Sequence, residues 1–326
     1  MKGENNLSFF DNVDINENYL LENFPQILDL LLKDNTTKKN IIWATNSYEN
    51  KGYYFNDQIY PTVIGNNSLI VPRAKKTLDE KNKRSKDKAE VFTPSWMCNK
   101  QNNLIDFEWF DKQNVFNEEK GKTWIVNKEK IAFPSNKNWT DYIKEIRLEI
   151  TCGEGPYIVS RYDTVTGKKI PLLNRIGVLD RKFRIINENA TNKEEWIKYS
   201  VIAIKSIYGY EWQGDNIILA RENVLFSYID YYIDKFNEIP SEELIKEISK
   251  IISWNIWQMD GLKGVVPHSC KTEKIAQMNL FGEKKTDDIG CLGCLKDDIK
   301  QHNGIYAKVM DWNTNKKIKF IDIIRG

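Results

Sequence analysis

The chain has 326 residues, of which 41% are hydrophobic and 29% are charged. This composition supports a full hydrophobic core and excludes a disordered or low-complexity chain. No run of eighteen apolar residues is present and the first residues lack an apolar leader, so we expect a cytoplasmic protein with no membrane partner. The net charge of +2, from 48 basic and 46 acidic residues, neither requires nor excludes a nucleic-acid partner.

Residues 1–80 are expected to form an N-terminal α+β extension. Apolar residues at positions 20–32 have the spacing of one helix face, and Pro25 suits the first turn of that helix. Residues 39–71 mix aromatic and β-branched residues with turn formers, which predicts short strands or an irregular packed region. The basic segment that follows, residues 75–88, is typical of a solvated loop, and contact with phosphate is its alternative role.

The most informative local pattern is a short apolar strand that ends in a turn with two glycines. Its residues are Leu148, Glu149, Ile150, Thr151, Cys152, Gly153, Glu154 and Gly155. At the carboxyl edge of an α/β sheet, glycine lets the backbone approach a ligand closely, and a nearby carboxylate can bind a ribose or an amino group. The sequence therefore predicts a ligand site at this turn.

Two further strands are expected downstream, the first at residues 206–211 and the second at residues 254–259. They end at Glu211 and Asp260, and helical apolar patterns follow the first of them. The long insert at residues 163–192 is expected to be a lid, a specificity element or surface decoration. This alternation predicts an α/β sheet flanked by helices, with residues 81–326 as one domain.

Four motifs occur in a fixed order, namely EVFTP at residues 90–94, EITCGEGPY at 149–157, YGYE at 208–211 and WQMD at 257–260. Together they resemble the amino-terminal half of the S-adenosylmethionine-dependent, adenine-specific DNA methyltransferases of bacterial restriction–modification systems. The likeness is greatest to proteins labelled restriction endonuclease subunit M, and it extends from about Ile41 to the carboxyl terminus. It implies a Rossmann-like class I methyltransferase sheet, S-adenosyl-L-methionine as cofactor and DNA as substrate.

The resemblance also implies roles for single residues. Gly153 and Gly155 would approach the methionine part of the cofactor, and Glu149 would fix the turn or accept the ammonium group. Glu211 would accept hydrogen bonds from the ribose hydroxyls, and Asp260 would accept one from the adenine amine. The full implied cofactor-binding set is Phe92, Thr93, Pro94, Glu149, Cys152, Gly153, Gly155, Glu211, Trp212 and Asp260.

Structural roles remain open for several of these residues. The two glycines can serve turn geometry alone, and Asp260 followed by Gly261 also fits a plain turn. Phe92 and Pro94 can be packing residues, and Cys152 is most economically a small buried residue.

The family's catalytic tetrapeptide, an Asn, Asp or Ser followed by two prolines and an aromatic residue, is missing, and the chain contains no Pro-Pro pair. Its final residues, 320–326, fall roughly where the family's next strand would lead into that motif. The catalytic residues are therefore unknown, and we expect a partner polypeptide to supply the motif and the DNA-recognition domain. The alternative is a catalytically inactive, methyltransferase-like regulatory or scaffolding subunit of a DNA-targeting defence complex. A third possibility is that unrecognised residues engage the amine, with Asn255 and Asp260 as conceivable substitutes.

A separate pattern lies in residues 268–302. His268, Cys270, Cys291 and Cys294 have the spacing of a tetrahedral zinc site, and His302 is a spare ligand. Four protein ligands leave no open position, so we expect a structural Zn²⁺ that pins the polar loop at 271–290. The alternative is a set of unliganded cysteines.

Overall fold

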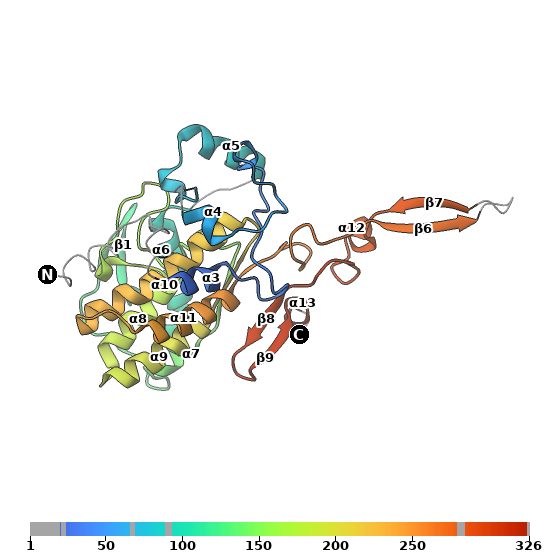
Figure 1. The fold of residues 1–326 in the computed structure, drawn as a ribbon. Coiled ribbons are helices and arrows are strands. Elements are labelled where there is room, and N and C mark those ends of the chain that lie inside the picture. The colour runs from blue at the N-terminus through green and yellow to red at the C-terminus, as the bar shows by residue number, and fades with distance from the viewer. Residues whose placement is uncertain (1–19, 21–23, 66–68, 89–92, 279–283, 325–326) are drawn as a thin grey trace.

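The computed structural model describes residue 20 and residues 24–65, 69–88, 93–278 and 284–324. Across these residues the protein is mixed α/β, with helices packed around a three-stranded parallel sheet (Figure 1). Three two-stranded antiparallel sheets lie outside that sheet within the described ranges. The α/β organisation expected from the sequence is confirmed at this level.

The parallel sheet contains the three expected strands in chain order, β3 (Arg147–Ile150), β4 (Ile207–Glu211) and β5 (Ile256–Gln258). Glu149 pairs with Gly209 and Gly209 pairs with Ile256, so the three strands run side by side in parallel. The third strand begins two residues later than expected, because the preceding helix continues to Asn255. The carboxyl ends of all three strands therefore meet at one edge, where ligands bind in open α/β sheets.

The connections between these strands are helical, with α8 (Val178–Asn189) and α9 (Lys193–Lys205) between β3 and β4, and α10 (Gly214–Phe236) and α11 (Glu242–Asn255) between β4 and β5. Side chains cap two of these helices. Asn192 accepts the N–H of Glu195 in α9, and Ser241 accepts the N–H of Leu244 in α11. The expected insert is partly helical, since its second half is α8, which packs against α9. That half is a covering helix of the domain and not a lid.

The remaining elements lie around this centre. They are α3 (Pro25–Leu32), η2 (Glu49–Lys51), α4 (Pro61–Gly65), η3 (Arg73–Lys75), α5 (Leu78–Lys88), α6 (Ser95–Phe110), β1 (Asn117–Lys120), β2 (Thr123–Val126), α7 (Trp139–Lys144), η4 (Leu172–Asn174), β6 (Glu273–Met278), β7 (Lys284–Ile289), α12 (Leu292–Lys296), β8 (Lys308–Asp311), β9 (Lys316–Lys319) and α13 (Phe320–Ile323). The β6–β7 hairpin projects from the body of the protein (Figure 1).

One continuous core extends from α3 to β5 and is centred on α10. The helix predicted near Pro25 is confirmed, and its residues Ile27, Leu28 and Leu31 are buried in this core. The proposed domain boundary at residue 80 stays a prediction, and the packing of α3 on α11 shows that both sides of it contribute to one core.

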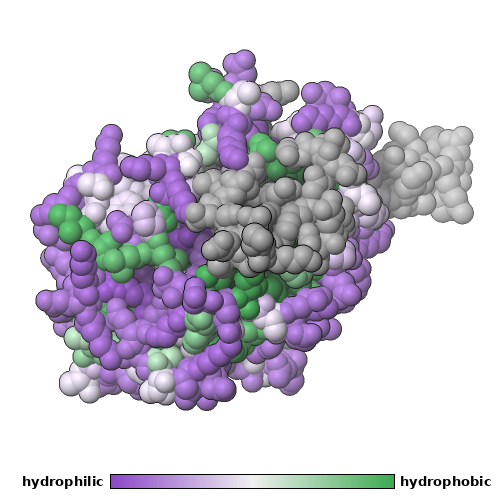
Figure 2. Space-filling view, turned by 60° about the vertical axis from the view of Figure 1, so that its left-hand side comes forward, coloured by the Kyte–Doolittle hydropathy of each residue, from purple (hydrophilic) through white to green (hydrophobic). Residues whose placement is uncertain are grey.

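The outer surface shows the complementary pattern. On the face shown in Figure 2, hydrophilic residues predominate and hydrophobic ones gather in separate patches. Among the described residues, no helix has both the length and the apolar character needed to cross a membrane.

The basic segment at residues 75–88 is mostly the helix α5, and two of its cations face inward. Lys76 and Arg84 are buried and pair with Asp215 at the start of α10, with an Arg84 Nη1 to Asp215 Oδ2 distance of 2.7 Å. Burial raises the pKa of Asp215, but Arg84 and Lys76 outweigh it and hold that pKa below its ordinary value. These two side chains stabilise the fold and are not available to bind phosphate.

A substitution at Arg221 tests how much helix α10 contributes to the stability of the core. Its fully buried guanidinium donates to the backbone carbonyls of Leu31, Lys33, Ser253 and Ile256, and so joins α3, α11 and β5. Arg221→Met would leave these carbonyls without donors and should lower the free energy of unfolding by about 3 kcal/mol. Urea unfolding measures the change. Lys246→Met, which removes a surface ion pair with Glu242, is the matched control and should cost about 0.5 kcal/mol or less.

Candidate functional site

The two-glycine turn follows β3 directly and bends toward α10. Cys152 donates its N–H to the carbonyl of Tyr210 on β4 (2.8 Å), and Gly155 donates to the carbonyl of Cys152 (2.7 Å). Gly153 and Gly155 have φ angles of 52° and 79°, a left-handed conformation that strains other residues. A Cβ on Gly155 would lie 3.8 Å from Ala220 of α10, so the turn runs beside that helix. Both glycines therefore have a conformational reason to be where they are.

Glu211 ends β4 and its carboxylate lies against the turn. One oxygen accepts the N–H of Gly153 (3.1 Å) and the other accepts the N–H of Gln213 (3.2 Å). The side chain is buried, and this burial raises its pKa, while backbone N–H groups from Gln213, Gly153 and Trp212 oppose the shift. The acid is thus held at the sheet edge by the backbone of the turn that the sequence predicted as its neighbour.

Glu149 lies on the adjacent strand, with its carboxyl directed inward. Its Oε2 atom is buried and has no hydrogen-bond partner among the described residues. Burial raises the pKa of this carboxyl well above its ordinary value, the N–H groups of Tyr157 and Ile158 oppose the shift, and the nearby Glu211 adds to it. Glu149 supports the turn from inside, as one of its two expected roles requires.

The segment that carries Thr93 and Pro94 packs beside the same turn. Pro94 precedes α6, and Asn102 of α6 donates to the carbonyls of Tyr157 (3.1 Å) and Ile176 (3.0 Å). The carbonyl of Thr93 accepts the hydroxyl of Thr164 (3.2 Å). Phe92 lies outside the described residues. The upstream motif and the glycine turn, about sixty residues apart in the chain, are neighbours through α6.

Asp260 and Trp212 are the remaining predicted site residues at the carboxyl edge of the parallel sheet. Asp260 follows β5, is buried, and accepts the N–H groups of Leu262 (3.1 Å) and Lys263 (3.2 Å) through Oδ1. It therefore makes the plain turn that was one of its two expected roles, and its Oδ2 lies 3.5 Å from Lys263 Nζ. Trp212 is half-buried and donates its indole N–H to the carbonyl of Ala44 (2.8 Å).

Cys152 has a structural place within this group. It is buried beneath Gly209 of β4, where an added Cβ would lie 3.1 Å from the Cys152 Cβ. Burial raises the pKa of its thiol well above the ordinary value, with the Glu149 and Glu211 carboxylates adding to the effect. A thiol of this kind packs and does not ionise, so the structure assigns Cys152 to the core beside the turn and gives it no contact surface for a ligand.

A second candidate site is a group of three cysteines and one histidine. The ligand atoms of Cys270, Cys291, Cys294 and His302 all lie within 4.8 Å of one another. His302 Nδ1 is 3.7, 3.5 and 3.6 Å from the three sulfur atoms, in that order. In a tetrahedral zinc site, bond lengths of about 2.3 Å to sulfur and about 2.0–2.1 Å to nitrogen place sulfur and nitrogen about 3.6 Å apart. The group therefore has the spacing of a tetrahedral metal site.

Two glycines make room for these ligands. An added Cβ on Gly293 would lie 2.6 Å from His302 Nδ1, and one on Gly304 would lie 3.0 Å from the sulfur of Cys270. The N–H of Asn303 points at the sulfur of Cys291 (3.3 Å), as backbone donors do around thiolate ligands. The two glycines therefore leave space for the ligands, and the Asn303 N–H is placed to stabilise a thiolate at Cys291.

The prediction that His268 belongs to the Cys/His group is wrong. The spare residue His302 occupies that position. His268 is exposed and has a left-handed backbone (φ 57°), which turns its ring toward Phe55 and Trp212, with ring-centroid distances of 4.6 and 5.2 Å. The prediction of a polar loop at residues 271–290 is also wrong, because most of these residues form the paired strands β6 and β7.

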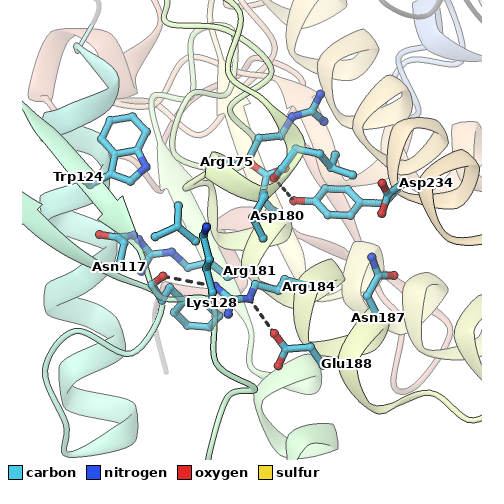
Figure 3. A pocket seen from close by; sticks show the side chains of 15 residues that line it. Asn117, Trp124, Lys128, Arg175, Asp180, Arg181, Arg184, Asn187, Glu188 and Asp234 are labelled. Carbon is cyan, nitrogen blue, oxygen red and sulfur yellow. Dashed lines mark hydrogen bonds and ion pairs between the residues drawn. The ribbon is translucent and has the colours of Figure 1, made fainter.

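A cavity of about 380 Å³ lies on another part of the surface, between the β1–β2 hairpin, α8 and α10. Figure 3 shows Trp124 on one side of it and the α8 residues Arg181 and Arg184 on the other. Arg181 pairs with Asp106, and Arg184 pairs with Glu188. Arg181 and Arg184 are therefore already neutralised within the protein, whereas Lys128, which also lines the cavity, is exposed.

Comparisons with protein-family models, with curated proteins and with solved structures found no match to this chain. Function is therefore inferred from the two sites themselves. The sheet edge combines glycine-opened backbone with two raised-pKa carboxyls, and the Cys/His group has the donor set and the spacing of a metal site.

The burial of Glu149 predicts a pH-dependent stability difference. Its pKa is higher in the folded protein than the value of about 4.3 expected in the unfolded chain, so the folded state binds a proton more readily. The contribution of Glu149 to wild-type stability should therefore fall as pH rises above about 4, whereas Glu149→Gln escapes this loss. The gain in unfolding free energy of the variant over wild type should be larger at pH 7 than at pH 4.

Denaturant unfolding across this pH range measures the gain. Glu194→Gln, on the exposed surface of α9, shows the effect of removing one negative charge without burial. A difference between Glu149→Gln and wild type that stays constant with pH would contradict the assignment.

Proposed function

We propose that this chain is the S-adenosyl-L-methionine-binding part of an adenine-specific DNA methyltransferase of a restriction–modification system. The observation that carries the proposal is the contact between the Gly153 N–H and the Glu211 carboxylate at the carboxyl edge of a parallel sheet. Glycine-opened backbone and an acid at the end of the next strand are the groups that bind a nucleoside with an amino-acid tail. The cofactor would supply a methyl group.

The residues present suit the parts of this cofactor. The Glu211 oxygens that now accept N–H groups from Gly153 and Gln213 are the acceptors that two ribose hydroxyls require. Asp260 would offer Oδ2 to the adenine amine in place of its 3.5 Å ion pair with Lys263, since Oδ1 holds its own turn. The negative potential of the Glu211 and Glu149 carboxyls, when ionised, favours the positive charge of a sulfonium. A Rossmann-like class I methyltransferase sheet is part of this proposal.

The catalytic tetrapeptide of adenine-specific DNA methyltransferases is missing from these 326 residues. No Asn, Asp or Ser is followed by two prolines and an aromatic residue, so the target amine has no recognised acceptor in this chain. In base-modifying enzymes such groups contact the flipped base. We therefore propose that a partner polypeptide carries the catalytic motif and reads the DNA.

One observation favours a second candidate, an inactive methyltransferase-like scaffolding subunit. Both oxygens of Glu211 and one of Asp260 are already occupied by the chain's own N–H groups. A site that is satisfied by its own backbone gains less from a ligand. Cofactor binding separates the two candidates.

Isothermal titration with S-adenosyl-L-methionine tests the cofactor site. Wild-type protein should bind, and Glu211→Ala should weaken binding about 100-fold, because two hydrogen bonds to a charged acceptor are lost. Glu194→Ala removes an exposed carboxylate on α9 and should bind as wild type does.

Lack of binding by folded wild-type protein at millimolar cofactor would remove the proposal and leave the scaffolding candidate. Equal binding by Glu211→Ala and wild type would mean that the cofactor sits elsewhere. Methylation of duplex DNA by the purified chain alone would contradict the requirement for a partner.

We further propose that Cys270, Cys291, Cys294 and His302 bind a structural Zn²⁺. Three thiolates and an imidazole are a common structural zinc donor set, and all four positions of a tetrahedron would be filled by protein. The ion would join the base of the β6–β7 hairpin to α12 and to the segment that follows it. Its role would be to hold this region together, because no position is left for a substrate.

Metal analysis of the purified protein tests this site, and the two histidines of the chain form a matched pair. Wild-type protein and His268→Ala should each contain one equivalent of zinc, whereas His302→Ala and Cys294→Ser should lose most of it. Removal of the metal with a chelator should expose residues 268–302 to proteolysis first. Zinc retained by His302→Ala and lost by His268→Ala would contradict the ligand assignment.

A further inference from the structure

Lysine side chains from three segments meet around Trp254 of α11. Lys38, in the turn after α3, lies over the indole ring at 4.9 Å from its centroid, and Lys317 of β9 lies over the same ring at 5.5 Å. Partial burial lowers the pKa of Lys38, and the charges of Lys317, Lys33 and Lys308 lower it further. The ammonium groups of these lysines are therefore close enough to repel one another.

The β8–β9 hairpin adds a second pair of like charges. Lys308 pairs with Lys319 in the strand register, so two cations lie directly opposite each other, which destabilises a sheet. Lys317 lies on the same face of the hairpin, because side chains alternate along a strand. Lys308, Lys317 and Lys319 are exposed, whereas Val309 and Ile318, on the other face, pack toward the core.

The lysine surface, as we call it, consists of five residues, Lys33, Lys38, Lys308, Lys317 and Lys319. None of them forms an ion pair within the described ranges. One acid, Asp34, raises the pKa of Lys38, but its two oxygens already accept the N–H groups of Thr36 (3.0 Å) and Thr37 (3.1 Å). A gathering of unneutralised like charges destabilises the folded chain by itself and is typical of a surface that binds an anion.

Hydrogen bonds hold the three segments of this surface in fixed positions. Lys308 donates its N–H to the hydroxyl of Thr36 (2.9 Å), which joins β8 to the turn after α3. Asn35 of the same turn donates to the hydroxyl of Ser253 on α11 (2.9 Å). The lysine side chains therefore start from an ordered backbone, and a ligand has only their outer atoms to order.

The composition of the surface favours nucleic acid over a membrane. Its cations are distributed over three segments, as the repeated phosphates of a nucleic-acid backbone require, and lysine binds phosphate as a point charge without reading a base. Proteins that lie on a membrane surface combine cations with exposed apolar side chains. Residues 33–40 and 308–319 contain no exposed large hydrophobic side chain.

We propose that the lysine surface binds the phosphate backbone of duplex DNA, independently of the DNA sequence. Duplex DNA carries about one negative charge per 1.7 Å of its axis, which matches a surface of several closely placed cations. None of the five lysines belongs to the proposed cofactor site, so the inference holds with either candidate function. Recognition of a particular DNA sequence stays with the proposed partner polypeptide.

Fluorescence anisotropy of a labelled DNA duplex of about 20 base pairs tests the proposal with the full-length chain and without cofactor. Wild-type protein should bind two duplexes of unrelated sequence equally, and more weakly as salt rises. The triple variant Lys38→Gln, Lys308→Gln, Lys317→Gln should raise the dissociation constant about 100-fold or more at roughly 0.1 M salt. It should also reduce the slope of log affinity against log salt by about 0.9 for each lysine removed.

The triple variant Lys122→Gln, Lys128→Gln, Lys130→Gln is the matched control. It removes the same charge from exposed residues of the β1–β2 hairpin and the segment after it, which lie far from β8 and β9 (Figure 1). This variant should bind DNA as wild type does. Thermal melting checks that both triple variants fold, and the lysine-surface variant should keep any cofactor binding that wild type shows.

Failure of folded wild-type protein to bind either duplex would overturn the proposal. Binding to vesicles that contain phosphatidylserine, without binding to DNA, would overturn it by assigning the lysines to a membrane surface. An equal loss of DNA binding in the two triple variants would also overturn it, because binding would then follow net charge and not this surface.

Discussion

Helix α10 begins in a space that has no room for a side chain, and the rest of the fold is arranged around that start. A Cβ on Gly214 would lie 2.1 Å from the carbonyl oxygen of Ile42. The next residue, Asp215, is fully buried and neutralised by Lys76 and Arg84. Six residues further along the helix, Arg221 binds carbonyls from three other segments. A buried charge is tolerated only with such partners. These contacts tie the N-terminal region, α5 and the parallel sheet to a single helix.

This arrangement also shifts the pKa values of three neighbouring acids in different directions. Asp215 has two cations beside it and keeps a low pKa, whereas Glu149 and Glu211 are buried with backbone N–H groups as partners and have raised pKa values. Backbone dipoles offset less of the cost of burial than full charges do. The two glutamates are therefore the carboxyls of this region that would gain from a cationic ligand, and they lie on adjacent strands at the edge where the glycine turn opens.

The two edges of the parallel sheet have different surroundings. Beyond β5, the side chain of Gln258 bonds to the backbone of Ile42, and residues after Asp260 pair with the segment near the Cys/His group. Beyond β3, apolar side chains face solvent. The sheet is therefore closed at the β5 edge and, among the described residues, open at the β3 edge.

The sequence by itself determined the positions of the three strands along the chain, the glycine turn, the acids at the strand ends and the three cysteines, because each depends on local spacing along the chain. The tertiary structure alone decided that Lys76 and Arg84 point inward to Asp215, that half of the expected insert is a core helix, and that His302 replaces His268 in the Cys/His group. His268 and His302 are equally good ligands by residue type, and spacing along the chain favoured His268. A left-handed backbone at His268 turns its ring toward Trp212, and that orientation depends on contacts between residues far apart in the chain, which no local pattern records.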